Sequence, residues 1–279
     1  MPRQNTKSIA VVGHGYVGKA VEHGFNTSHV DLHLIDPYLY GNSVGELQGK
    51  VRIDCAFVCV PTPFGADGSI DSSIVEEVVK ELEYFSCMIV IKSTVTPDVI
   101  ERLSKENDQI IYNPEFLTER NALEDFVNPS MHVFGGKPQY TEQLYKLYNH
   151  YSQCKPCPVF HMSAMEASFV KYGINSFLAT KVLWFNQFKD IIDDHDCKYN
   201  VIVNAIGSDP RIGQSHTQVP GPDGRKGFGG ACFPKDTNAF ASFANGDFEI
   251  LDEVIKLNNI YRKAYELDDR EKEQKVNYG

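Results

Sequence analysis

The stretch Ser8-Ile9-Ala10-Val11-Val12-Gly13-His14-Gly15-Tyr16-Val17-Gly18 decides the first half of the fold. Its apolar, β-branched start predicts a strand, and the three glycines that follow have the spacing G-x-G-x-x-G. The first glycine permits a tight turn, the second lets a pyrophosphate approach the backbone, and the third lets a helix pack on the strand. We therefore expect a helix to continue through Lys19–Phe25, with its N-terminal amides facing an anion.

A carboxylate follows at the distance that this pattern requires. The apolar run Leu32–Ile35 predicts a second strand, and Asp36 ends it roughly twenty residues after Gly13. A carboxylate at this point accepts hydrogen bonds from ribose hydroxyls and repels a 2′-phosphate. The sequence therefore predicts NAD rather than NADP as cofactor, bound by Gly13, Gly15, Tyr16, Val17, Gly18 and Asp36.

Strand and helix patterns alternate through the first 163 residues, which predicts an α/β fold with a doubly wound, parallel Rossmann sheet. The expected strands are Ser8–Val12, Leu32–Ile35, Cys55–Val60, Met88–Ile91, Ile110–Tyr112, Met131–Phe134 and Val159–His161. The expected helices between them include Ser72–Phe85 and Pro97–Leu103.

Ligands of such sheets bind beyond the carboxyl ends of the strands, so residues that follow strands are candidates for the site. Pro61 and Thr62 follow one strand and Thr94 follows the next, and we expect all three to bind the cofactor. Glu115 and Glu119 follow a third strand. They are either site residues or a solvated helix face, and Pro, Ser, Thr and Asn after strands are also ordinary turn residues.

From Ala164 onward the pattern becomes helical, which predicts an all-α domain over residues 164–279. A long central helix to about His195 has apolar residues around much of its circumference, as in a helix buried against several partners, including a second subunit. Lys171 and Asn175 lie one turn apart on it. Their spacing favours an exposed polar stripe over a buried pair that faces a cleft. Helices are also expected at Val201–Ile206, Lys235–Phe243 and Phe248–Tyr265, and the charged tail after Asp268 is expected to fray.

The stretch Gly227-Phe228-Gly229-Gly230-Ala231-Cys232-Phe233-Pro234-Lys235-Asp236 is the main chemical candidate. Pro234 and Asp236 suit the first turn of a helix, so Cys232 is expected just ahead of a helix N-terminus. The positive end of a helix lowers a thiol pKa and favours the nucleophilic thiolate. The alternative is a small apolar residue in a glycine-rich turn. The glycines before Cys232 and the charged residues after it favour the nucleophile.

Composition excludes several classes of protein. The chain has 279 residues and a formal net charge of −10, which argues against a nucleic-acid surface. It has no apolar run of membrane-spanning length and no signal-peptide core. Its seven cysteines lack the spacing of a disulfide framework, which indicates a reducing, cytoplasmic location. The Cys154-x-x-Cys157 pair is interpreted as incidental, with a zinc or redox role as the minority alternative, and no metal site is expected.

From about Ile9 to Arg262 the chain resembles the nucleotide-sugar 6-dehydrogenases of the UDP-glucose and UDP-mannose type. The shared motifs occur in family order. They are Gly13–Gly18, Ser93-Thr94-Val95, Asn113-Pro114-Glu115-Phe116-Leu117 with Glu119, Lys171 with Asn175, Asp209-Pro210-Arg211-Ile212-Gly213 and Gly227–Asp236.

The resemblance implies oxidation of a sugar C6 alcohol to the acid with two NAD per turnover, through a thiohemiacetal and a thioester on Cys232. It implies that Lys171 and Asn175 stabilise negative charge, that Asp236 and Thr94 orient a water or a proton relay, and that Glu115 or Glu119 is the general base. The implied substrate contacts are Phe116, Leu117, Lys171, Asn175, Arg211, Phe228 and Gly229.

Relatives of this kind carry a third domain that binds the nucleotide, and the sequence after the last predicted helices does not supply one. We expect a shortened enzyme, a separate UDP-binding polypeptide, a smaller sugar derivative as substrate, or an inactive protein. Two other hypotheses remain. One is a β-hydroxyacid-type dehydrogenase, which needs a single oxidation and no cysteine, and the other is an NAD-binding partner protein without turnover. A homodimer through the long helix is expected in each case.

Overall fold

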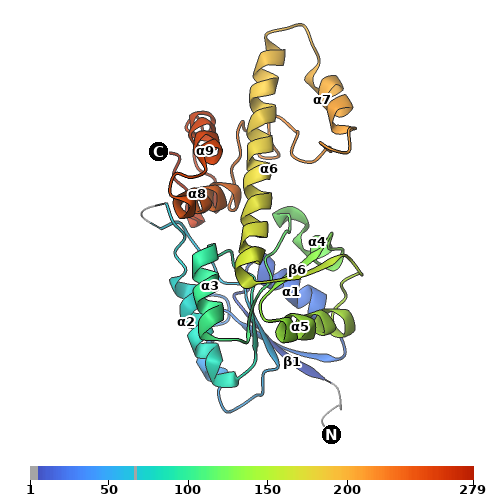
Figure 1. Cartoon of the computed structure of the whole chain (residues 1–279), viewed down its shortest axis with the longest axis vertical. Coiled ribbons are helices and arrows are strands. Elements are labelled where there is room, and N and C mark those ends of the chain that lie inside the picture. Colours follow the sequence, from blue (N-terminus) through green and yellow to red (C-terminus); the bar gives the residue numbers. More distant parts are fainter. Residues whose placement is uncertain (1–5, 66–67) are drawn as a thin grey trace. The chain divides into compact units, whose positions relative to one another are not determined.

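The computed structural model describes residues 6–65 and 68–279 (Figure 1). The chain forms two compact units, which are described separately. The first comprises Met1–Thr62 and Asp71–Lys171, and the second comprises Pro63–Ile70 and Tyr172–Gly279. The long helix α6 (Ala164–Asp193) contributes residues to both units.

The first unit is built on a seven-stranded sheet with the order β2-β1-β3-β4-β5-β6-β7. Its strands are β1 (Lys7–Val12), β2 (Val30–Ile35), β3 (Cys55–Val58), β4 (Met88–Ile91), β5 (Ile110–Tyr112), β6 (His132–Gly135) and β7 (Val159–Met162). The strands predicted from sequence all form, with ends that differ by one or two residues, and the α/β class is confirmed.

One pairing corrects the expectation of a parallel sheet. Strand β6 runs antiparallel to β5, with Tyr112 opposite Gly135, whereas every other pairing in the sheet is parallel. A parallel neighbour requires a crossover that carries the chain back along the sheet, usually in a helix. The helix between these strands is α4 (Ala122–Val127), which rises only about 9 Å, so the chain re-enters the sheet in the opposite direction.

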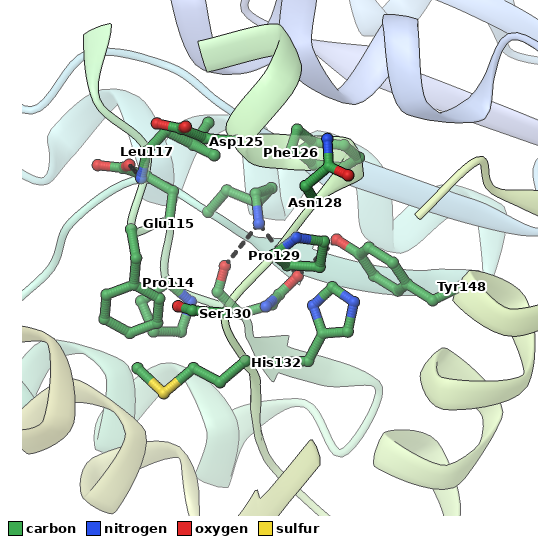
Figure 2. A pocket seen from close by; sticks show the side chains of 14 residues that line it. Pro114, Glu115, Leu117, Asp125, Phe126, Asn128, Pro129, Ser130, His132 and Tyr148 are labelled. Carbon is green, nitrogen blue, oxygen red and sulfur yellow. Dashed lines mark hydrogen bonds between the residues drawn. The ribbon is translucent and has the colours of Figure 1, made fainter. Parts of the chain in front are cut away.

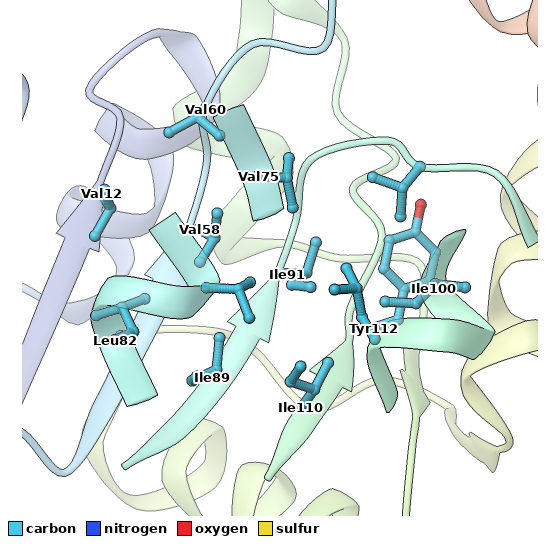
Figure 3. Packing of buried hydrophobic residues seen from close by; sticks show 14 of the residues in the cluster. Val12, Val58, Val60, Val75, Leu82, Ile89, Ile91, Ile100, Ile110 and Tyr112 are labelled. Carbon is cyan, nitrogen blue, oxygen red and sulfur yellow. The ribbon is translucent and has the colours of Figure 1, made fainter. Parts of the chain in front are cut away.

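The strands are buried on both faces, and alternate residues of each strand enter different cores. Ala10 and Val12 of β1 point into one core, while Ile9 and Val11 point into the other. Figure 3 shows part of the first core, in which Val58 and Ile89 of the sheet lie near Leu82 of helix α2 (Ser73–Leu82). Alternation between two cores is the reason that these strands read as continuous apolar runs.

Helices cover both faces of this sheet. Helices α2 and α3 (Pro97–Glu106) pack into the first core, and α1 (Tyr16–Phe25), α4 and α5 (Pro138–Tyr151) pack into the second. Helices α4 and α5 are not among the helices predicted from the sequence. Short 3₁₀ turns, η1, η2 and η3, occur at Val44–Leu47, Glu83–Phe85 and Glu119–Asn121.

The second unit is helical. In addition to its part of α6 it contains α7 (Tyr199–Gly207), α8 (Phe233–Ala244), α9 (Glu249–Arg262) and α10 (Asp269–Glu273). Leu183 of α6, Phe228 and Val254 of α9 form one small core, while Phe185 and Tyr199 belong to a second. Not all of the apolar circumference of α6 is covered, because Phe177, Trp184 and Ile191 are exposed.

The prediction of a fraying tail is wrong. Asp268 caps α10 with a capping box, in which its side chain accepts from the Glu271 amide and the Glu271 side chain accepts from the Asp268 amide. Glu271, Val276 and Tyr278 are all buried. A high density of charged residues usually marks a solvated segment, but here the acidic Glu271 finds basic partners inside the unit.

Across the part of the chain that the structure describes, no helix combines the length and the apolar character needed to cross a lipid bilayer.

Candidate active site

The glycine loop between β1 and α1 has the geometry that the sequence predicts. Gly13 has a φ of +87°, and a Cβ there would lie 2.6 Å from the carbonyl oxygen of Cys59. A Cβ on Gly18 would lie 2.0 Å from the Gly13 carbonyl oxygen, so the helix packs directly on the loop. A Cβ on Gly15, by contrast, would meet nothing within 4 Å. The open space is at the second glycine, the position where a pyrophosphate approaches the backbone.

Asp36 is tied to this loop. Its Oδ2 accepts the His14 amide at 2.9 Å, and its Oδ1 accepts the amides of Tyr38 and Leu39. Partial burial acts to raise the pKa of Asp36, but the three amide hydrogen bonds outweigh burial and hold the pKa below its ordinary value. A carboxylate has about four acceptor sites, so one remains for a ribose hydroxyl.

Sequence reasoning missed the buried His14. Its Nε2 lies 2.8 Å from Glu22 Oε2, and its Nδ1 lies 2.8 Å from the Tyr40 hydroxyl. These contacts hold the loop between α1 and the segment after β2. The only sequence signal is the place of His14 between two fingerprint glycines.

Of the other predicted cofactor residues, Tyr16 and Val17 open α1, and the Tyr16 hydroxyl lies 3.5 Å from Glu115 Oε1. Pro61 is exposed and Thr62 is buried in the segment after β3, and Thr94 is buried after β4. Ser93 joins these two segments, because its hydroxyl donates to the Val60 carbonyl at 2.7 Å. The first unit thus combines an open glycine turn at a helix N-terminus with a carboxylate beside it, a geometry that fits a dinucleotide such as NAD.

Lys171 and Glu115 form a buried ion pair. Lys171 Nζ donates to Glu115 Oε1 at 3.0 Å and to the Glu115 carbonyl oxygen at 2.7 Å, and it lies 5.7 Å from the centre of the Phe116 ring. The second carboxylate oxygen of Glu115 accepts the Leu117 amide. Lys171 is therefore not part of an exposed stripe, and Glu115 is not on a solvated face. Glu119, at the start of η3, is exposed.

Beside this pair lies a cavity of about 230 Å³ that the sequence did not indicate (Figure 2). Lys92 Nζ donates to the carbonyl and Oδ1 oxygens of Asn113, and the Tyr148 hydroxyl donates to the same Oδ1 at 2.7 Å. Burial lowers the pKa of Lys92 to about 8. Burial, together with the charge of Lys92, lowers the pKa of His132 to about 4.

In the second unit, Cys232 immediately precedes α8, as predicted, and the Asp236 amide donates to its carbonyl oxygen at 2.8 Å. Asp236 is buried in the first turn. Its Oδ2 accepts from Asn175 Nδ2 at 2.6 Å, and its Oδ1 accepts from Lys235 Nζ at 2.7 Å. Asn175 is therefore buried rather than on an exposed stripe. Lys235 also belongs to this group, although its place in the sequence predicts no role for it.

The glycine-rich loop, residues 221–230, precedes Cys232 and is held at several backbone amides. The Gly227 amide donates to Asn186 Oδ1 at 3.0 Å, and the Gly230 amide donates to Glu271 Oε1 at 3.3 Å. The Asn258 side chain binds the backbone of Phe228 twice. Its Oδ1 accepts the Phe228 amide, and its Nδ2 donates to the Phe228 carbonyl oxygen. The Phe228 side chain lies in the core of the unit. Sequence reasoning missed Asn186, Asn258 and Glu271, since a polar residue within a helix carries no signal of a distant loop.

Arg211 is exposed and forms a bidentate pair with Asp209 in its own loop. Its predicted role in substrate binding stays a prediction, as do those of Phe116, Leu117, Phe228 and Gly229. Within residues 6–65 and 68–279, no three His, Cys, Asp or Glu side chains gather closely enough to hold a metal ion.

Comparison with known families gives two matches. Residues 42–152 match the NAD binding domain of the UDP-glucose/GDP-mannose dehydrogenase family, and residues 165–260 match the central domain of the same family. The first match confirms NAD as the cofactor class of the sheet unit. Residues 261–279 lie outside both matches.

Curated relatives are similar over most of the chain. The UDP-glucose 6-dehydrogenase of Bacillus subtilis is 29% identical over 90% of this chain, and that of Rickettsia bellii is 34% identical over 74%. The alignments cover 66% and 49% of those two proteins, so the chain spans about half to two thirds of their length.

Solved structures show the same fold. A UDP-glucose dehydrogenase from Pyrobaculum islandicum superposes with a TM-score of 0.78 at 28% identity, over 93% of this chain and 70% of that one. The 3-hydroxyisobutyrate dehydrogenase of Mycobacterium tuberculosis has a TM-score of 0.70 at 14% identity, over 93% and 94% of the two chains. The second likeness concerns the fold alone.

Proposed function

Because the chain belongs to the UDP-glucose/GDP-mannose dehydrogenase family, we propose that it oxidises the C6 alcohol of a UDP-sugar to the uronic acid with NAD. We assign residues 1–163 to cofactor binding and residues 164–279 to the domain that carries the catalytic cysteine. The observation that carries the proposal is the position of Cys232 immediately before α8. In the first turn of that helix, Asp236 accepts hydrogen bonds from Asn175 and Lys235.

Two oxidations are needed to convert an alcohol to an acid, and NAD accepts one hydride in each. In the first, the alcohol loses a hydride and a proton and becomes an aldehyde. The Cys232 thiolate adds to the aldehyde carbon, and the resulting oxyanion takes a proton to give a thiohemiacetal. Loss of a second hydride and proton gives a thioester. Water then hydrolyses the thioester, which releases the acid and regenerates the thiol.

The protein groups have separate tasks in this scheme. The Lys171 ammonium and the Asn175 amide stabilise negative charge on the reacting oxygen. Asp236 and Thr94 orient a water or a proton relay. The Glu115 carboxylate already pairs with Lys171, which favours a role in positioning that ammonium. The exposed Glu119 is then the better candidate for the general base of hydrolysis.

The stoichiometry of NADH tests the mechanism. Wild-type protein with NAD and a panel of UDP-sugars should form two NADH per sugar consumed. Cys232→Ser should lower the rate of acid formation by a factor on the order of 10³ or more. Cys197→Ser is the matched control, because Cys197 is exposed and lies outside the proposed site. One NADH per sugar, together with full activity of Cys232→Ser, would exclude the covalent mechanism.

A single-step β-hydroxyacid dehydrogenase is the second candidate, favoured by Lys171 and Asn175, which are both buried one turn apart on α6, because a single oxidation needs no cysteine. It predicts one NADH per substrate, oxidation of small hydroxy acids, and activity that survives Cys232→Ser.

We further propose a homodimer through α6 and, for the nucleotide end of the substrate, either a separate UDP-binding polypeptide or direct binding by this chain. Thermal stabilisation by UDP-sugars in the presence of NAD supports direct binding, because a ligand stabilises according to its concentration relative to its Kd. No stabilisation until a second polypeptide is added supports the separate partner.

A further inference from the structure

The segment Asp268–Gly279 contributes Glu271 and Tyr278 to a buried cluster of charged and polar side chains. This cluster contacts the glycine-rich loop at Gly230. The Glu271 carboxylate is fully buried, and its Oε1 accepts from Arg262 Nη2 at 2.6 Å and from the Tyr278 hydroxyl at 2.6 Å. Its Oε2 accepts the Asp268 amide and lies 3.5 Å from Arg225 Nη1. Burial acts to raise the pKa of Glu271, but these hydrogen bonds and charges hold it below its ordinary value.

The same cluster holds the loop at both of its ends. Arg262 Nη1 donates to Asp223 Oδ2 at 2.7 Å at the start of the loop, while Glu271 Oε1 accepts the Gly230 amide near its end. Arg262 has no exposed surface, so the pair is shielded from water. Between these anchors, Gly227 and Gly229 both lie close to the Arg262 side chain.

Gly229 shows how close this approach is. A Cβ at Gly229 would lie 2.2 Å from Arg262 Nη2 and 2.6 Å from Glu271 Oε1. The absence of a side chain at Gly229 therefore leaves room for the Arg262–Glu271 pair, and the predicted substrate contact of Gly229 stays a prediction. The loop backbone is thereby shaped by the segment that follows α9.

Glu271 is the anchor nearest to Cys232. Asn186 and Asn258 hold the loop at Gly227 and Phe228, and Glu271 holds it at Gly230, two residues before the cysteine. Loss of the Glu271 contact leaves the first two anchors in place. The consequence should therefore be concentrated on the residues that lead into α8.

We propose that the segment Asp268–Gly279 positions the catalytic loop, with Glu271 and Arg262 as positioning residues that set the place of Cys232 at the start of α8. The inference rests on the proposed function for the role of Cys232 in turnover. It adds residues 268–279, which lie outside both family matches, to the machinery of the reaction.

The test compares Glu271→Gln with Glu273→Gln, because Glu273 is an exposed residue of the same short helix. The first readout is the rate at which iodoacetamide alkylates Cys232, measured by mass spectrometry relative to the exposed Cys197 in the same chain. We expect Glu271→Gln to change this ratio at least fivefold and Glu273→Gln to leave it unchanged. An unchanged ratio in folded Glu271→Gln would overturn the proposal.

The second readout is steady-state kinetics with NAD and UDP-glucose. Glu271→Gln should lower kcat at least tenfold and leave the KM for NAD within twofold, because the fingerprint residues lie in the other unit. A loss of melting temperature without any change in kcat or in Cys232 alkylation would assign the cluster to stability alone and overturn the proposal.

Two further arms keep the test decisive. If Glu271→Gln does not fold, Tyr278→Phe removes one donor to Glu271 and should shift the alkylation ratio in the same direction by a smaller factor; no shift overturns the proposal. If the wild-type protein oxidises no sugar, the proposed function fails, and the alkylation ratio alone decides whether the segment positions Cys232.

Discussion

Single residues in this protein take their roles from burial rather than from their type. Lys171 and Asn175 lie one turn apart on α6, a spacing that is equally typical of a solvated stripe. Both are buried, and each has an acidic partner in its own unit, Glu115 and Asp236. The partners come from segments far away in the sequence, so helical spacing had no means to identify them.

Asp36 provides a residue-scale prediction about the cofactor. Asp36→Asn should raise the Kd for NAD about tenfold, equivalent to about 1.4 kcal/mol, and permit detectable binding of NADP, since it removes the charge that repels a 2′-phosphate. Titration calorimetry with both cofactors measures the change. Asp31→Asn, a change at an exposed position of strand β2, which precedes Asp36, should leave both affinities as they are. Equal NAD affinity in Asp36→Asn would remove Asp36 from the cofactor site.

His132 provides a prediction about pH. Its pKa of about 4 in the folded protein lies below its unfolded value of about 6.5, so the unfolded chain binds a proton in this window that the folded chain does not. The stability that neutral His132 contributes is present above pH 6.5 and is lost as the pH falls toward 4. Urea unfolding at pH 7.5 and 4.5 should show that His132→Phe loses less stability than wild type, by up to about 2 kcal/mol. Parallel losses in both proteins would contradict this.

At the scale of elements, the pattern of apolar residues predicts the strands of the sheet, and their packing into two cores confirms them. The strands form where apolar, β-branched runs predict them, because alternate side chains enter two cores and each run must be apolar throughout. Helices α4 and α5 are not evident from the sequence. Their exposed faces carry many polar residues, and aromatic residues interrupt the helical spacing of the aliphatic ones. The antiparallel pairing of β6 with β5 depends on the length of α4. No single residue type in the sequence predicts that length.

Gly173 provides an element-scale prediction. It lies inside α6, it is exposed, and a Cβ there would meet nothing within 4 Å. Gly173→Ala should raise the free energy of unfolding by about 0.5–1 kcal/mol, because alanine loses less backbone entropy in a helix. Chemical denaturation measures the difference. Gly229→Ala should act in the opposite sense, since its Cβ would collide with Arg262. Destabilisation by Gly173→Ala would mean that the space beside this glycine is used.

At the scale of the whole molecule, apolar residues of α6 are left uncovered in a single chain. Phe177, Trp184 and Ile191 are spaced by seven residues, so they share one face of the helix, and more than half of each side chain is exposed. A continuous apolar stripe of this kind is typical of a helix that packs against a partner. The homodimer and the cytoplasmic location both stay predictions.

Trp184 tests the dimer. Trp184→Lys places a charge in the centre of the stripe and should convert a dimer to a species of 31.4 kDa in light scattering coupled to size exclusion. Ile260→Lys is the matched control, because Ile260 is also an exposed apolar residue and lies on α9 instead. A wild-type protein that elutes as a monomer at micromolar concentration would contradict the dimer, as would equal effects of the two variants.

The sequence by itself determined the alternation of strands and helices, the glycine fingerprint with Asp36, and the place of Cys232 at a helix start. These features depend on local spacing, which the order of residues states directly. Only the tertiary structure decided that Lys171 pairs with Glu115, that Asn175 and Lys235 hold Asp236, and that Glu271 is buried under the glycine-rich loop. Apart from the neighbouring Lys235 and Asp236, these contacts join residues distant in sequence, and the free energy of burying a charge depends on the partner that folding brings to it.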